Sequence, residues 1–115
     1  MNKKTPPFPK YNAWTTARFW SFIRSNLRQA WVKWPPRYEC LNEARRPYKG
    51  KDKRRKYEYQ CAICQEWFMQ KAVEVDHTIP CGSLKGYEDL SGFVERLFAP
   101  VETLRCVCKE CHKNV

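Results

Sequence analysis

The sequence predicts an α+β protein in which a small cysteine-rich module follows a basic helical arm. Positive charge is concentrated in the first half of the chain, where one long segment has apolar residues at helical spacing. The second half alternates short strand-like and helix-like segments between two Cys-x-x-Cys pairs. The chain has 115 residues, the length of one domain, and 30% of them are charged, above the roughly 25% that is typical. With so little apolar material for a core, we expect the chain to need a further stabilising element.

The charge distribution divides the chain into two parts. The net charge is +10, yet residues 1–60 carry 16 Lys or Arg against 4 Asp or Glu, and residues 61–115 carry 6 against 8. A basic segment joined to a mildly acidic module indicates that one part grips a polyanion which the other reads or acts on. No apolar stretch approaches the roughly 20 residues that cross a membrane, and Pro6, Pro7 and Pro9 interrupt any export signal. We therefore expect a soluble protein with no membrane partner.

The basic arm is predicted to contain a helix from about Thr16 to Lys33, capped by Thr15 or Thr16 and ended by Pro35-Pro36. The residues at helical spacing that should face a core are Phe19, Phe22, Ile23, Leu27, Ala30, Trp31 and Trp34. The other face carries Arg18, Arg24, Arg28 and Lys33. Such a face is either solvated surface or a contact for phosphates, with Arg24 and Arg28 as the candidates.

Residues 45–56 read RRPYKGKDKRRK, with eight basic residues and one acid, interrupted by Pro47 and Gly50. This composition predicts a flexible, solvated linker. The linker is either a solubilising tether or a nucleic-acid contact, and we expect contact because counterion release favours binding of such dense positive charge to phosphates. The candidate contacts are Arg45, Arg46, Lys49, Lys51, Lys53, Arg54, Arg55 and Lys56.

The cysteine-rich half is predicted to run in the order knuckle, strand, helical insertion, strand and short helix. Apolar and acidic residues alternate over residues 72–76, as in a short strand, and Pro80 ends it. Residues 87–98 form the insertion helix and residues 101–107 the second strand. A final turn of helix begins at Cys108. The residues of the insertion helix predicted to face inward are Leu90, Phe93, Val94, Leu97 and Phe98.

Two close cysteine pairs, Cys61-x-x-Cys64 and Cys108-x-x-Cys111, are separated by 43 residues. In a chain without an export signal they are better read as thiolate metal ligands than as disulfides. Each pair presents two thiolates from one tight turn, so the four predict a closed tetrahedral site for structural Zn²⁺. His112 could replace one cysteine, but four thiolates suffice without it. The sequence shows no partner for Cys40, and Cys81 and Cys106 are expected to pack as small apolar groups.

The chain has two histidines, and each follows a feature tied to a knuckle. His77 follows Asp76 at the end of the first predicted strand, and His112 follows Cys111. A shared zinc ion would draw them together. Two imidazoles and a carboxylate outside a closed zinc site could form a second, open metal site.

The stretches CAIC, VEVDHTIPCGSL and LRCVCKECHK resemble the zinc-knuckle branch of the HNH endonucleases, which have the ββα-metal fold, and especially the small versions found in tailed phages. The resemblance covers residues 57–115, and the preceding basic segment is similar to the arm of such phage proteins. It implies a DNA-binding arm and linker over residues 1–56 and a zinc-stapled nuclease module over residues 57–115. It also implies hydrolysis of DNA phosphodiester bonds, on duplex DNA, in the cytoplasm of a bacterial host.

The resemblance also implies roles for single residues. In that family the first His is the general base, while the Asp before it and the last His hold a catalytic divalent ion; these fall on His77, Asp76 and His112. One carboxylate and one imidazole suit Mg²⁺, Mn²⁺ or Ni²⁺. Thr103 occupies the position of the family's Asn, which pins the loop that orients the base, and a Thr hydroxyl makes fewer hydrogen bonds. A catalytically decayed, zinc-bound DNA- or partner-binding protein is therefore the alternative.

Overall fold

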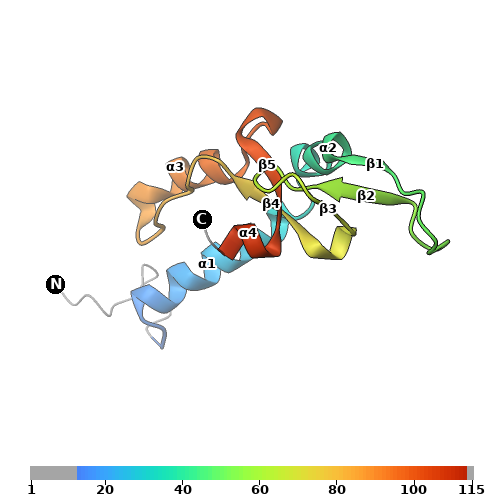
Figure 1. Cartoon of the computed structure of the whole chain (residues 1–115). Helices are drawn as coiled ribbons and strands as arrows, with labels where there is room; N and C mark the ends of the chain where they lie inside the picture. Colours follow the sequence, from blue (N-terminus) through green and yellow to red (C-terminus); the bar gives the residue numbers. More distant parts are fainter. Residues whose placement is uncertain (1–12, 114–115) are drawn as a thin grey trace. The chain divides into compact units, whose positions relative to one another are not determined.

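The computed structural model of the chain describes residues 13–113 and divides into two compact units (Figure 1). The first, here called the helical unit, takes its residues from 1–33 and 80–98; the second, the cysteine unit, takes them from 34–79 and 99–115. The basic half of the chain therefore contributes to both units. No helix within residues 13–113 combines the length and the apolar character needed to cross a membrane. The boundary predicted at residue 56 concerns domains rather than compact units, and stays a prediction.

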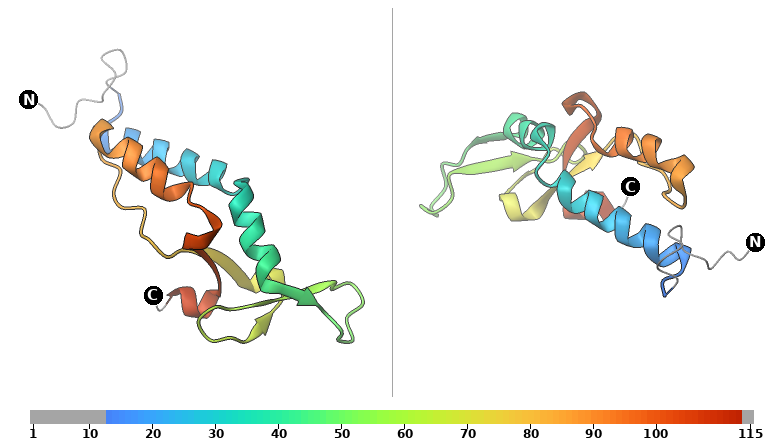
Figure 2. Two further views of the ribbon diagram at one scale, coloured as in Figure 1. Left: turned by 90° about the horizontal axis from the view of Figure 1, so that it is seen from above. Right: turned by 180° about the vertical axis from the view of Figure 1, so that it is seen from behind.

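The helical unit consists of α1 (Thr16–Trp31) and α3 (Tyr87–Leu97), which lie side by side in Figure 2. Thr15 caps α1, as predicted, because its hydroxyl accepts a hydrogen bond from the Arg18 amide at 3.1 Å. Both predicted helices are confirmed, with α1 ending two residues earlier than expected. The buried core between them consists of Phe19, Trp20, Cys81, Leu84, Phe93 and Leu97.

The buried stripe of α1 differs from the predicted one at three positions. Ala30, predicted to face inward, is exposed. Trp20 is only 4% exposed and belongs to the core, whereas Phe22, predicted to face inward, is 50% exposed. Trp20 continues the row formed by Ile23, Leu27 and Trp31 at helical spacing, so it shares their face. Phe22 instead meets the ring of Trp14 edge-on, with centroids 5.2 Å apart.

The cysteine unit begins with a helix that the sequence prediction missed, α2 (Pro35–Ala44). Pro35 and Pro36 were expected only to end the preceding helix. They also begin the next one, because proline is tolerated in a first turn, where its missing N–H has no partner. Trp34 precedes them, and its indole donates a hydrogen bond to the Ala99 carbonyl at 2.8 Å. α2 packs against β5 (Leu104–Cys108).

The prediction that residues 45–56 form a flexible linker is wrong. β1 (Arg45–Pro47) pairs antiparallel with β2 (Tyr57–Gln60), which pairs with β3 (Trp67–Phe68), giving a sheet in the order β1-β2-β3. The Tyr48 amide extends the ladder to the Lys56 carbonyl at 2.9 Å. The residues from β1 to β2 therefore form a β-hairpin, the green loop at one side of Figure 1.

Stacking of guanidinium groups on aromatic rings explains how so basic a segment folds. The Arg46 guanidinium lies 3.6 Å from the centroid of the Trp67 ring, and its Nε also pairs with the Glu58 carboxylate at 2.7 Å. Arg45 stacks on Tyr57 at 4.0 Å. Each stack gives a cation a favourable partner that composition does not reveal, since the two members are on different strands. Arg55 adds a third such stack, on Tyr48.

A second sheet holds the two strands predicted around the insertion. β4 (Val73–His77) pairs antiparallel with β5, from Val73 opposite Cys108 to His77 opposite Leu104. The first strand is confirmed to within one residue. The first three residues of the second predicted strand instead form a 3₁₀ turn, η2 (Val101–Thr103). A 3₁₀ turn of the same length, η1 (Gln70–Ala72), precedes β4. The predicted final helix is α4 (Lys109–Lys113), one short turn.

The three cysteines outside the two Cys-x-x-Cys pairs are all buried. Cys81 lies in the core of the helical unit and Cys106 within β5, so their predicted role as small apolar groups is confirmed. Cys40 lies on α2 and is 6% exposed. Burial raises the pKa of the Cys40 thiol to about 11 and that of Cys106 to about 12, and Cys40 contributes to the rise at Cys106. Cys40 is therefore a core residue of the cysteine unit.

Replacing Cys40 with Ser should destabilise the cysteine unit by about 1–3 kcal/mol, because it buries a hydroxyl in place of a weakly polar thiol. Asn42→Ser, on the exposed side of the same helix, is the matched control and should have little effect. Chemical denaturation of the metal-loaded proteins measures both changes. Equal unfolding midpoints for Cys40→Ser and the parent would contradict the burial of Cys40.

Candidate functional site

Four cysteines from the two predicted knuckles converge in the cysteine unit. The Sγ atoms of Cys61, Cys64, Cys108 and Cys111 all lie within 4.8 Å of one another. Zinc bound by four thiolates at about 2.3 Å would place neighbouring sulfurs about 3.8 Å apart, and the Cys64 and Cys108 Sγ atoms are separated by 4.0 Å. The cluster could bind a metal and is consistent with structural zinc.

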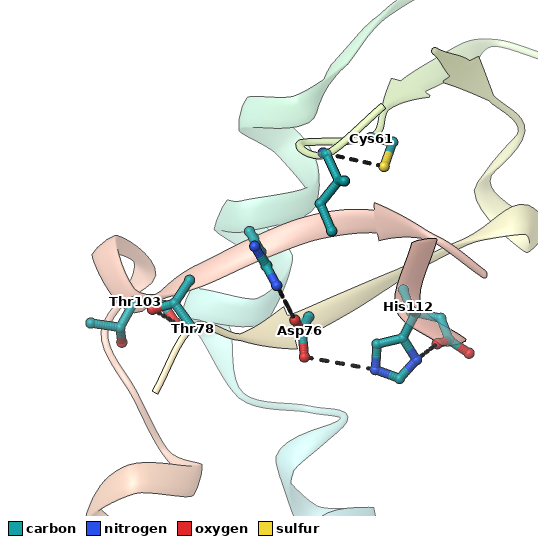
Figure 3. Close-up of polar contacts among 8 residues, drawn as sticks. Cys61, Asp76, Thr78, Thr103 and His112 are labelled. Atoms are coloured by element: carbon teal, nitrogen blue, oxygen red, sulfur yellow. Dashed lines mark hydrogen bonds and ion pairs between the residues drawn. The ribbon is translucent and has the colours of Figure 1, made fainter. Parts of the chain in front are cut away.

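Tight turns aim backbone amides at the sulfurs. In the first knuckle the Ile63 and Cys64 amides lie 3.4 and 3.5 Å from Cys61 Sγ. Figure 3 labels Cys61 and marks one contact at its sulfur. The turn closes through Gln65, whose φ of 62° is in the left-handed region and whose amide donates to the Cys61 carbonyl. In the second knuckle the Cys111 amide lies 3.4 Å from Cys108 Sγ. Such N–H groups stabilise thiolates, the form that binds metal.

The electrostatics of the four thiols also fit a cation. Burial raises the pKa of Cys61, but the amides directed at its sulfur outweigh burial and lower the pKa to about 6. The neighbouring Cys108 sulfur, followed by burial, raises the pKa of Cys111 to about 12. Four thiolates this close repel one another strongly, so full ionisation requires a bound cation.

A cluster of charged side chains lies on β4, β5 and α4, in the same unit (Figure 3). Asp76 Oδ2 accepts two hydrogen bonds from the Arg105 guanidinium, from Nε at 3.1 Å and Nη2 at 3.0 Å. His112 Nδ1 lies 2.8 Å from Glu74 Oε2, and its Nε2 lies 3.7 Å from Asp76 Oδ1. Glu74 and Asp76 are two residues apart on β4 and therefore share one face of the strand. The cluster thus joins the end of one strand to the final helix.

The position of Glu74 defines what His112 can bind. A carboxylate at Nδ1 favours a proton on that nitrogen, which leaves the Nε2 lone pair directed toward Asp76 Oδ1. Two acceptors that face each other in this way require either a proton or a cation between them. Neighbouring ligands about 2.1 Å from one octahedral ion are about 3.0 Å apart, so the two atoms, now 3.7 Å apart, would have to move closer to bind one such ion side by side.

This second site is less complete than the cysteine cluster. Within residues 13–113, the four cysteines are the one group of three or more His, Cys, Asp or Glu ligand atoms that lie together. If Asp76 and His112 bound a divalent ion, they would supply two protein ligands, and water or substrate oxygens would have to complete its coordination. His112 is 44% exposed and Asp76 is 16% exposed, so solvent or substrate can reach the pair through the histidine side.

His77 does not join this cluster. It is half-buried at the end of β4, and the alternation of side chains along a strand places it on the face of Val75, opposite the face of Asp76. The structure therefore brings His112 to Asp76, while His77 lies across the strand from them.

Thr103 holds the loop after His77, but through its main chain. Its carbonyl accepts hydrogen bonds from the Thr78 amide at 2.9 Å and the Thr78 hydroxyl at 3.1 Å (Figure 3). The Thr103 hydroxyl instead donates to the Pro100 carbonyl at 3.1 Å, within its own turn. The connection expected of an Asn side chain is therefore made by atoms that every residue has.

The predicted DNA contacts are divided between the two units. Arg24 and Arg28 are exposed on α1 of the helical unit, and Arg24 lies 5.7 Å from the Phe93 ring centroid. The eight basic residues from Arg45 to Lys56 are all on the β-hairpin of the cysteine unit and its loop.

Sequence reasoning missed Glu74, Arg105 and Thr78. Two signals could have found the first two. Glu74 precedes Asp76 by two residues, the repeat of a strand. Once the knuckles align β4 with β5, residue 105 must lie opposite Asp76, as the register shows. Thr78 had no such signal, because its partner is a backbone carbonyl.

Comparison of the chain with protein-family models, with curated proteins and with solved structures found no match. The resemblance to HNH endonucleases therefore depends on the motif residues themselves. A function for the site has to be argued from its chemistry.

If the four cysteines hold structural zinc, one zinc ion should copurify with each chain. Removing it should unfold the cysteine unit, because the ion joins segments distant in sequence and binding energy at such a site is folding energy. Elemental analysis gives the metal content, and amide hydrogen exchange before and after chelation shows which strands lose protection. A folded monomer without metal, with β4 and β5 protected, would contradict this assignment.

Glu74→Ala should change the protonation of the His112 ring, because the acceptor on Nδ1 is lost. In the neutral ring the proton should move from Nδ1 to Nε2, where Asp76 can accept it. Long-range ¹⁵N–¹H spectra of the imidazole report this tautomer directly. Glu110→Ala, an exposed acid on the same short helix, is the control and should leave the spectrum unchanged. An unaltered tautomer in Glu74→Ala would show that Glu74 does not orient the ring.

Proposed function

We propose that this chain is a metal-dependent endonuclease of the HNH type, which hydrolyses phosphodiester bonds of duplex DNA. The observation that supports this best is the pairing of His112 with Asp76 next to a four-cysteine cluster. The pair is built on two antiparallel strands and the helix that follows them, the order expected of a ββα-metal module. The carboxylate of Glu74 on the far nitrogen of His112 suits a metal-binding imidazole.

In this proposal Asp76 Oδ1 and His112 Nε2 hold Mg²⁺, Mn²⁺ or Ni²⁺. Such an ion would stabilise negative charge on the leaving oxygen of the scissile phosphate. Arg105 holds Asp76 in place by donating to its other carboxylate oxygen, Oδ2, and leaves Oδ1 available. Glu74 accepts from Nδ1 and so favours the tautomer of the neutral His112 ring that leaves the Nε2 lone pair available. These two residues therefore act as positioning residues for the two ligands.

His77 is the proposed general base. In-line hydrolysis requires the attacking water and the leaving oxygen on opposite sides of phosphorus, so a base on the opposite face of β4 from the ion ligands suits the reaction. A phosphate bound across the end of β4 would lie between them. The two hydrogen bonds from Thr78 to the Thr103 carbonyl fix the backbone immediately after the base. The base then starts close to its reactive orientation.

The Asp76–Arg105 pair also favours a second candidate, a DNA-binding protein without nuclease activity. A guanidinium that donates twice to one carboxylate oxygen reduces the negative charge available to a cation. A protonated His112 between Glu74 and Asp76 would then complete an ion-pair network that needs no metal. In this candidate the basic residues bind DNA and the polar cluster only stabilises the fold.

His77→Ala should reduce metal-dependent cleavage of supercoiled plasmid by about 10²- to 10⁴-fold, the usual loss when a general base is removed. DNA affinity should hardly change, because the basic residues and the four cysteines are intact. His112→Ala should lose activity through weaker binding of the ion, so high Mn²⁺ should restore part of it. Mn²⁺ should not rescue His77→Ala, which serves as the matched comparison.

Cleavage assays with and without Mg²⁺, Mn²⁺ or Ni²⁺, together with binding measured by fluorescence anisotropy, distinguish the two candidates. A parent protein that binds duplex DNA but cuts none with any of these ions would favour the non-catalytic candidate. Cleavage by His77→Ala at the rate of the parent would exclude His77 as the base.

A further inference from the structure

A basic groove lies in the cysteine unit, between the β-hairpin and the η1 turn. It has a volume of 370 Å³, and four of its eight lining residues are cations: Arg54, Arg55, Lys56 and Lys71. None of the described residues that line it is acidic. Two acids close in sequence lie outside the lining: Glu58 pairs with Arg46 at 2.7 Å, and Asp52 lies 3.6 Å from Arg54 Nε. Unbalanced positive charge around a concave surface attracts an anion.

The groove is ordered by contacts within the protein. The Arg55 guanidinium lies 4.0 Å from the centroid of the Tyr48 ring, and the Arg55 amide donates to the Asp52 carbonyl at 3.1 Å. Tyr59, which also lines the groove, is buried in the sheet, and its hydroxyl lies 3.5 Å from Gln70 Oε1. A guanidinium fixed by stacking loses less conformational entropy on binding than a free side chain does.

Arg55 also has unused hydrogen-bonding capacity. Its Nε is buried and has no hydrogen-bond partner among the residues that the structure describes. A buried guanidinium nitrogen without a partner is unfavourable, and because solvent does not reach this nitrogen, an anion in the groove would have to be bound by the terminal nitrogens of the same guanidinium. The planar fork of an arginine matches the oxygens of a phosphate.

We propose that this groove binds a backbone phosphate of the DNA on which the protein acts, with Arg55 and Lys71 as its main contacts. The choice of DNA rests on the function proposed above, while the anionic character of the ligand rests on the groove itself. Lys71 is a contact that the charge pattern of the basic arm did not indicate, since it lies beyond the first knuckle.

The groove has a defined place relative to Asp76 in the same unit. Lys71 lies in η1, which leads directly into β4, and is five residues before Asp76. At about 3.3 Å per residue this separation is on the order of 15 Å. The phosphates of one strand wind around the duplex axis while they advance 3.4 Å per nucleotide along it, so the groove would hold a phosphate roughly two or three nucleotides from the one being cut. It would therefore act as an anchor that sets the position of the scissile bond.

Two double variants with equal charge changes test the groove. Arg55→Gln with Lys71→Gln removes the contacts proposed for the groove, whereas Lys49→Gln with Lys51→Gln removes two exposed charges of the same hairpin that were predicted to contact DNA but do not line the groove. Affinity for a 20-base-pair duplex is measured by anisotropy across a salt series without divalent ions, so that cleavage does not interfere. The groove variant should bind about tenfold more weakly or worse, and its salt slope should fall by about 0.9. The loop variant should lose less than about threefold.

Equal losses in the two double variants would overturn the proposal, because only total charge would then matter. Lys71→Gln alone, an exposed change, gives the same comparison against Lys51→Gln if the Arg55 change disturbs the hairpin. Titration of the protein with inorganic phosphate, followed by NMR and compared with chloride at equal ionic strength, shows whether the groove binds a free anion. Phosphate binding in the groove without any selective loss of duplex affinity would overturn the assignment to DNA.

The cleavage assay separates this proposal from the proposed function. Selective loss of duplex affinity in the groove variant, with a parent protein that never cuts, would support the groove and contradict the nuclease. Metal-dependent cutting by the parent protein, with equal losses of duplex affinity in the two double variants, would support the nuclease and contradict the groove. With both proposals correct, the groove variant should still cut at saturating protein, at positions shifted from those of the parent.

Discussion

The structure of the cysteine unit depends on the convergence of four sulfurs from segments that are 43 residues apart in the chain. Cys108 is the last residue of β5 and pairs with Val73, so the knuckles set the register of β4 against β5. That register places Arg105 opposite Asp76, and the turn at Cys111 brings His112 back over the same strand. The geometry of the polar cluster is therefore a consequence of the cysteine cluster.

The elements that the sequence predicted well are those defined by local signals. The Thr15 cap, the periodicity of α1 and α3, the alternation in β4 and the Cys-x-x-Cys spacing each involve residues within a few positions of one another. The hairpin was predicted wrongly because its stability comes from partners on different strands, such as Arg46 and Trp67. Charge composition alone cannot show that a cation has an aromatic ring to stack on.

In the candidate site, too, the sequence predicted the residues that belong to local motifs and missed those that depend on strand pairing. Asp76 and His112 stand in motifs and do come together, whereas Glu74 and Arg105 belong to the cluster only through strand pairing. The burial of Cys40 could not be predicted for a related reason. Cys40 is buried because it lies on α2, and this helix was missed when Pro35-Pro36 was interpreted only as the end of the preceding helix. Long-range pairing has to be known before such residues can be assigned.

The hydrogen bonds from Thr78 to the Thr103 carbonyl have a consequence for how such proteins can vary. A task performed by a side chain constrains which amino acid can occupy a position, whereas a task performed by a carbonyl constrains only the path of the backbone. Position 103 can then change identity while the connection to Thr78 persists, provided that the η2 turn keeps its shape. A motif defined by the letter at this position would overlook chains that make the same connection.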